Sequence, residues 1–123
     1  LQGNTAPYLQ YAYTRVRSIF RKAGEGGTNY KALQLEHPDE LTLAKHLLSF
    51  GLVLELVADD YRPNFLCNYL YELAGHFARF YESCPVLKSE EPQRSSRLIL
   101  CDLTARVLKE GLQVLGIETS EQM

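Results

Sequence analysis

Apolar residues recur at three- and four-residue steps along most of the chain, which is the spacing of one face of an α-helix. Glycine, proline and charged residues interrupt this spacing and mark where helices end. We predict helices at about residues 5–23, 38–50, 52–60, 64–83 and 95–115. No segment alternates apolar and polar residues as a β-strand does. The pattern therefore predicts an all-α domain, a bundle of four long helices and one short helix.

The helix predicted over residues 64–83 is apolar around most of its circumference and is expected at the centre of the bundle. Its main stripe is Leu66, Leu70, Leu73, Phe77 and Phe80, broadened by Tyr69, Tyr71, Ala74, Ala78 and Tyr81. Each of the other helices is expected to bury one stripe. In the second and third helices the stripes are Leu41, Ala44, Leu47 and Leu48, then Leu52, Val53, Leu56 and Val57. In the last helix the stripe is Leu98, Cys101, Ala105, Leu108, Leu112 and Leu115.

The first predicted helix carries two distinct stripes. The apolar stripe is Leu9, Ala12, Val16, Ile19, Phe20 and Ala23, and the aromatic and basic stripe is Tyr8, Tyr11, Arg15, Ser18 and Lys22. Residues 1–24 contain four Lys or Arg and no acid, although the whole chain has a net charge of −2. Aromatic rings that stack on unpaired bases, beside cations that hold phosphates, suit single-stranded RNA. Tyrosines also fill gaps at the margins of bundles, so periodicity alone leaves both interpretations open.

Composition narrows the class of protein. A chain of 123 residues with 46% hydrophobic and 23% charged residues has the size and composition of one globular domain. No apolar run approaches the roughly 20 residues of a membrane span. The three cysteines form no C-x-x-C pair and are expected to be reduced thiols. The chain begins at Leu1 and not at a methionine, which suggests a piece of a longer protein.

The sequence contains no recognisable catalytic motif. No glycine-rich loop precedes a helix in the way that nucleotide-binding sites require, and no serine lies in a nucleophile elbow. His37, His46 and His76 share no metal-ligand spacing with one another or with a cysteine. We therefore expect surface or hydrogen-bonded histidines and no metal site. The domain is expected to be non-catalytic.

Three parts of the chain resemble the C-terminal, DALR-type anticodon-binding domain of arginyl-tRNA synthetases, which are class I enzymes. The first is Gly3-Asn-Thr-Ala-Pro-Tyr-Leu-Gln-Tyr-Ala-Tyr-Thr-Arg15. The second is Tyr69-Leu-Tyr-Glu-Leu-Ala74 with Phe80-Tyr-Glu-Ser-Cys-Pro-Val-Leu87. The third is Arg97-Leu-Ile-Leu-Cys-Asp-Leu-Thr-Ala-Arg106, with Gly111-Leu-Gln-Val-Leu-Gly-Ile117 and the final Met123. By this resemblance residues 1–5 are a junction with a catalytic domain, and residues 6–123 are the anticodon-binding domain.

The resemblance implies that the domain binds the anticodon stem-loop of arginine tRNA. The implied contact residues are Tyr8, Tyr11, Arg15, Tyr81 and Met123, with Ser18 and Lys22 as possible phosphate contacts. The parent enzyme would attach arginine to tRNA with ATP and magnesium. The HIGH-type and KMSKS-type signatures of that catalysis do not occur in this chain, so we expect it to be inactive alone and to hold no cofactor. We expect a cytoplasmic monomer without membrane contact. The alternative is a free-standing helical module that binds another protein.

Overall fold

The computed structural model describes residues 5–24, 33–60, 62–117 and 119, and within these residues the chain forms helices and no strand. The helices are α1 (Thr5–Ala23), α2 (Pro38–Leu48), α3 (Phe50–Asp60), α4 (Pro63–Ser83) and α5 (Gln93–Val114). The predicted all-α bundle is therefore confirmed. Helices α2 and α3 have 11 residues each, because Ser49 ends α2 and α3 begins at the next residue.

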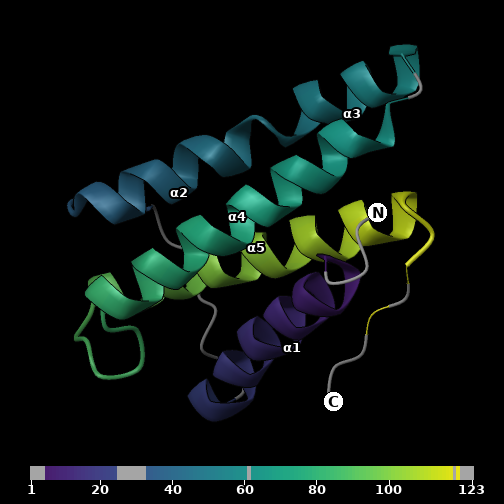
Figure 1. Ribbon diagram of the computed structural model, residues 1–123. Helices are drawn as coiled ribbons and strands as arrows, with labels where there is room; N and C mark the ends of the chain where they lie inside the picture. The colour runs from purple at the N-terminus through teal and green to yellow at the C-terminus, as the bar shows by residue number, and fades with distance from the viewer. Residues whose placement is uncertain (1–4, 25–32, 61, 118, 120–123) are drawn as a thin grey trace.

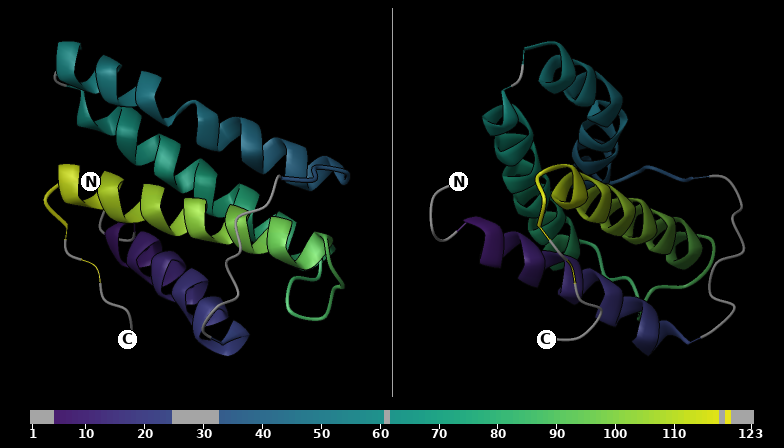
Figure 2. Two further views of the ribbon diagram at one scale, coloured as in Figure 1. Left: turned by 180° about the vertical axis from the view of Figure 1, so that it is seen from behind. Right: turned by 90° about the vertical axis from the view of Figure 1, so that its right-hand side faces the viewer.

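Helix α4 lies at the centre of the bundle and packs against each of the other four helices. Figure 1 shows α2 and α3 on one side of the layer formed by α4 and α5, with α1 on the opposite side. The two views in Figure 2 show the same order of layers. Helix α4 therefore presents side chains toward two separate layers of the molecule.

The core follows the predicted stripe of α4. All five of its main residues are buried: Leu66, Leu70, Leu73, Phe77 and Phe80. Helix α1 contributes Leu9, Val16 and Ile19 as predicted, and also Tyr13, which the stripe did not include. Helices α4 and α5 approach closely at Gly111, where a Cβ atom would lie 2.7 Å from a methyl carbon of Leu70. The absence of a side chain at residue 111 is what permits this close packing.

The predicted buried stripes of α2 and α3 are wrong at four leucines, which are exposed: Leu41, Leu48, Leu52 and Leu56. The exposed fraction reaches 84% at Leu48. Leu43 and Glu40 occupy the buried side of α2 instead. Within α4, Tyr71 and Ala78 were also expected to broaden the core, and both are exposed. When a helix has apolar residues on more than one face, periodicity cannot show which face is buried. Other contacts then determine the rotation of the helix.

The carboxylate of Glu40 sets the rotation of α2. Its Oε1 accepts hydrogen bonds from the backbone N–H groups of Glu36 at 3.2 Å and His37 at 2.8 Å. Its Oε2 accepts a hydrogen bond from Nε of Arg97 on α5 at 3.2 Å. The His37 ring in turn accepts a hydrogen bond from the backbone N–H of Asp39, which completes a capping box. A buried carboxylate is tolerated only with such partners, so α2 cannot turn to bury its exposed leucines.

One segment of the described chain, Pro38–Asp59, is long enough to span a membrane and contains an 18-residue stretch of suitable mean hydropathy, of which 17% is buried. This segment is not one continuous helix, because α2 ends at Leu48. Both of its helices pack on α4, and its buried Glu40 is paired with Arg97. In this structure Pro38–Asp59 forms an outer layer of the bundle, and the exposed leucines of this segment raise its mean hydropathy.

Candidate nucleic-acid interface

The outer face of α1 presents the aromatic and basic residues that the sequence predicted. The exposed fraction is 41% for Tyr8 and 54% for Tyr11, and Arg15 is exposed one turn further along. Buried residues on the opposite side of α1, Leu9 and Val16 among them, hold the helix against α4 and α5. The packing therefore fixes the direction in which the three polar side chains point.

Helix α4 extends this face with Tyr71, a residue that its spacing predicted to be in the core. The ring of Tyr71 lies beside that of Tyr8, with centroids 5.2 Å apart and planes inclined by 40°. The exposed fraction of Tyr71 is 55%. Its spacing along α4 resembled that of a core residue, and only the packing of α1 on α4 brings it beside Tyr8. The structure thus brings together three exposed tyrosines at the start of α1.

The two possible phosphate contacts lie further along α1. Lys22 is exposed in the last turn. The hydroxyl of Ser18 donates a hydrogen bond of 2.7 Å to the carbonyl oxygen of Arg15, so it has to turn before it can donate to a phosphate. Arg94 adds a cation from α5 at this end, where its NH2 donates to the carbonyl of Ala23 at 3.4 Å. The cations therefore gather toward the C-terminal half of α1.

Arg17 has a different role from its neighbours on α1. Its guanidinium lies over the ring of Phe20, 5.0 Å from the centroid, and 3.9 Å from the carboxylate of Asp102 on α5. That carboxylate also pairs with Arg106 at 3.0 Å. These contacts direct Arg17 toward α5, away from the face that holds Tyr11 and Arg15.

Of the two remaining predicted contact residues, only Tyr81 is described by the structure, and it lies apart from the start of α1. Tyr81 is half-buried near the end of α4, where its ring stacks on Phe77 with centroids 5.9 Å apart. Met123 lies outside the described residues, as do residues 1–4 of the predicted junction. At the start of α1, the described residues therefore form one exposed face of Tyr8, Tyr11 and Arg15 together with Tyr71.

Comparison with known proteins identifies the fold. The profile of the family described as "DALR anticodon binding domain" matches residues 9–123. The chain belongs to this family. The resemblance noted in the sequence is thereby confirmed, because the DALR domain profile covers all three of its stretches from Leu9 onward.

Curated relatives of this DALR domain bear the name arginine–tRNA ligase. The protein of a Synechocystis strain is 56% identical over 128 residues, and that of Hahella chejuensis is 55% identical over 124 residues. Each match covers 100% of this chain, which spans about a fifth of the relatives' length, 21% and 22%. Among solved structures, the arginyl-tRNA synthetase of Thermus thermophilus has a TM-score of 0.87 at 37% identity. That of Plasmodium falciparum has a TM-score of 0.82 at 30% identity. Both matches cover 99% of this chain and 22% of the other.

Proposed function

We propose that this DALR domain binds the anticodon stem-loop of arginine tRNA, as the C-terminal part of an arginine–tRNA ligase. The observation that carries the proposal is the outer face of α1. Tyr8, Tyr11 and Arg15 point to solvent there, while the opposite side of the same helix is fully committed to the core. A rigid helix that presents rings and cations together suits the unstacked bases and phosphates of an RNA loop.

The division of roles follows from side-chain chemistry. Flat, exposed rings such as Tyr8 and Tyr11 offer stacking surfaces to unpaired bases, and Arg15 offers a fork of donors to a phosphate. Ser18 and Lys22 extend the phosphate contact along α1. Tyr81 and Met123 are further contacts on the family resemblance alone. Sequence-specific RNA recognition favours loops because only unpaired bases expose their edges and faces.

The activity of the whole protein is proposed from its relatives. Their name, arginine–tRNA ligase, implies the attachment of arginine to tRNA, and this chain matches about a fifth of their length. We propose that ATP and magnesium act in the catalytic part of such an enzyme, that this domain alone is inactive, and that it works as a cytoplasmic monomer. Its contribution to the reaction is to hold the correct tRNA.

The proposal is tested by titrating a labelled arginine-tRNA anticodon stem-loop with the chain at several salt concentrations. Tyr11→Ala should weaken binding by about 1–3 kcal/mol, the contribution of one stacked base. Because the Tyr11 ring is mostly exposed, the fold should be unaffected. Arg15→Gln should reduce the slope of log K against log salt by about 0.7 to 0.9 through the loss of one phosphate contact.

Lys45→Gln is the matched control for Arg15→Gln. It removes one exposed positive charge from α2, which lies on the opposite side of the α4–α5 layer from α1. Its salt slope should equal that of the unmodified chain. A stem-loop with a changed central anticodon base should bind more weakly. Unchanged affinity in Tyr11→Ala, or equal effects of Lys45→Gln and Arg15→Gln, would contradict the assignment of this face.

A further inference from the structure

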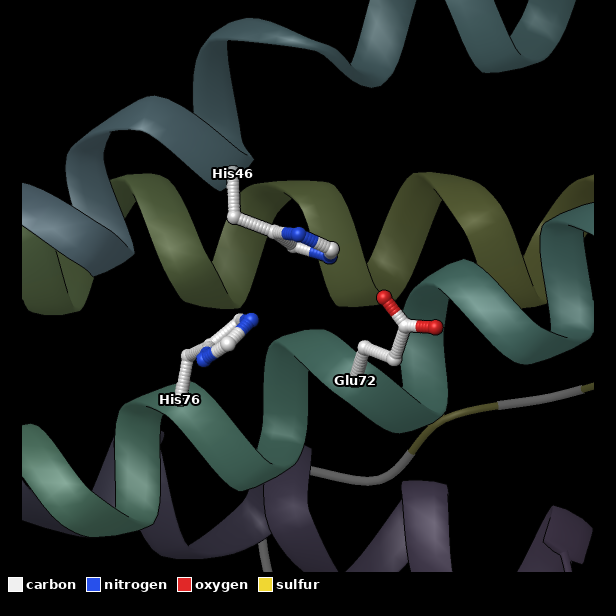
Figure 3. Close-up of side chains that lie close together, drawn as sticks. All are labelled: His46, Glu72 and His76. Atoms are coloured by element: carbon white, nitrogen blue, oxygen red, sulfur yellow. The ribbon is translucent and has the colours of Figure 1, made fainter.

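Three metal-binding side chains meet where α2 packs on α4: His46 from α2, and Glu72 and His76 from α4. One ligand atom from each lies within 4.8 Å of those of the other two. Figure 3 shows the three side chains directed toward one another from the two helices. Glu72 and His76 are four residues apart, so they lie on one face of α4. The imidazoles of His46 and His76 meet edge to face with centroids 4.8 Å apart.

Two contacts with Tyr69 fix the position of the His46 ring. It stacks on the ring of Tyr69 with centroids 4.2 Å apart, and its Nε2 lies 3.0 Å from the carbonyl oxygen of Tyr69. A carbonyl can only accept a hydrogen bond, so Nε2 carries the proton and Nδ1 keeps its lone pair. Metal-bound histidines almost always donate their other N–H to such a partner, which fixes the tautomer and the ring.

We propose that His46, Glu72 and His76 bind a zinc ion that links α2 to α4. Two imidazole nitrogens and a carboxylate oxygen form a donor set that zinc accepts, with water in the fourth position. Donor atoms around tetrahedral zinc lie about 3.3 Å apart, so donor atoms up to 4.8 Å apart need to approach by as much as about 1.5 Å. Glu72 is exposed, so its carboxylate can move toward the two imidazoles. The site is separate from the RNA-binding face of α1 and does not depend on the proposed function.

Arg79 competes with the metal for His76. Its NH2 lies 2.8 Å from Nδ1 of His76, and a guanidinium can only donate, so Nδ1 accepts this hydrogen bond. A zinc ion on Nδ1 would displace Arg79. A zinc ion on Nε2 would place the proton on Nδ1, which also ends the bond. Either way the Arg79 charge has to move away, so its removal should strengthen metal binding.

The experiment measures zinc binding to the metal-stripped chain by calorimetry, with the cobalt absorption spectrum as a report of coordination. The unmodified chain should bind one zinc ion and give the d–d bands of a tetrahedral nitrogen and oxygen site. His76→Ala and Glu72→Gln should each weaken binding about tenfold or more, since loss of even a supporting residue costs 10- to 100-fold. Arg79→Gln should tighten binding. Zinc should raise the unfolding temperature of the unmodified chain and not that of His76→Ala.

His37→Asn is the matched control. It removes the remaining histidine of the chain, which lies at the start of α2, and asparagine can still cap that helix. Zinc affinity in this variant should be unchanged. The proposal is overturned if the unmodified chain binds no zinc, or if His76→Ala and Glu72→Gln bind it as well as the unmodified chain does. It is also overturned if Arg79→Gln does not bind zinc more tightly.

Discussion

Because α5 approaches α4 closely at Gly111, the effect of Gly111→Ala on stability should change sign with the size of the side chain at residue 70. A Cβ atom at residue 111 would lie 2.7 and 2.8 Å from the two methyl carbons of Leu70 and 3.1 Å from its Cγ. Leu70 is fully buried and cannot turn away. Overpacking of this kind costs about 1–3 kcal/mol, while replacing a helical glycine by alanine gains about 1 kcal/mol. Gly111→Ala should therefore lower the free energy of unfolding by up to about 2 kcal/mol.

The same substitution should have the opposite effect once Leu70 is shortened. Leu70→Ala alone should cost about 2–5 kcal/mol through the cavity that it leaves. In that background the clash is absent, so Gly111→Ala should stabilise the protein by about 1 kcal/mol through helix propensity. Urea unfolding of the unmodified chain, both single variants and the double variant measures the coupling. If Gly111→Ala changes the unfolding free energy equally in both backgrounds, the two side chains do not meet and the packing is wrong.

Three further predictions test the fold. Glu40→Ala leaves the mostly buried Arg97 without its carboxylate and should cost about 3–5 kcal/mol in urea unfolding; a loss below about 1 kcal/mol would mean a solvated pair. Leu48→Ser should change stability by less than about 0.5 kcal/mol, whereas Leu43→Ala should cost about 2–5 kcal/mol, and equal losses would contradict the assigned rotation of α2. Burial raises the pKa of Tyr69 to about 12. The Tyr69 hydroxyl ionises near pH 10 in the unfolded chain and stays protonated there in the folded chain. The contribution of Tyr69 to the free energy of unfolding should therefore be constant below pH 10 and fall between about pH 10 and 12. Tyr69→Phe should reduce that fall. If stability depends on pH identically in Tyr69→Phe and in the unmodified chain, ionisation of Tyr69 is not the cause of the fall.

The fold was predictable in helices that carry a single dominant apolar stripe. The apolar stripe of α4 runs for about four turns, and its main residues are all buried. Periodicity did not predict the buried face of α2, because leucines occur on more than one face of this helix. The contacts of the buried Glu40 determine which face is buried. Glu40 reaches Arg97 on α5, which is 57 residues away in the sequence. No local pattern shows that partner, so the exposed Leu48 was expected in the core.

Some residues of the candidate sites could be predicted from a single helix, and others only from the packing between helices. Tyr8 and Tyr11 are displaced around the helix from Leu9 and Val16, so burial of one stripe implies exposure of the other. Their exposure could therefore be anticipated from α1 alone. Tyr71 could not be assigned to this face without the packing of α1 on α4. His46 and His76 are likewise 30 residues apart in the sequence, and only the packing of α2 on α4 brings them together.

Helix α4 supports both surfaces through residues that are neighbours in the sequence. Tyr71 reaches Tyr8 on α1, while Glu72 lies with His46 from α2 on the other side of the bundle. Successive residues are about 100° apart around a helix, so one helix can serve two layers without sharing a side chain. Zinc should therefore raise the unfolding temperature without changing RNA affinity at temperatures where the chain is folded. A zinc-dependent affinity would require the ion to move α4 relative to α1, and the close-packed core around Leu70 and Leu73 resists such a movement.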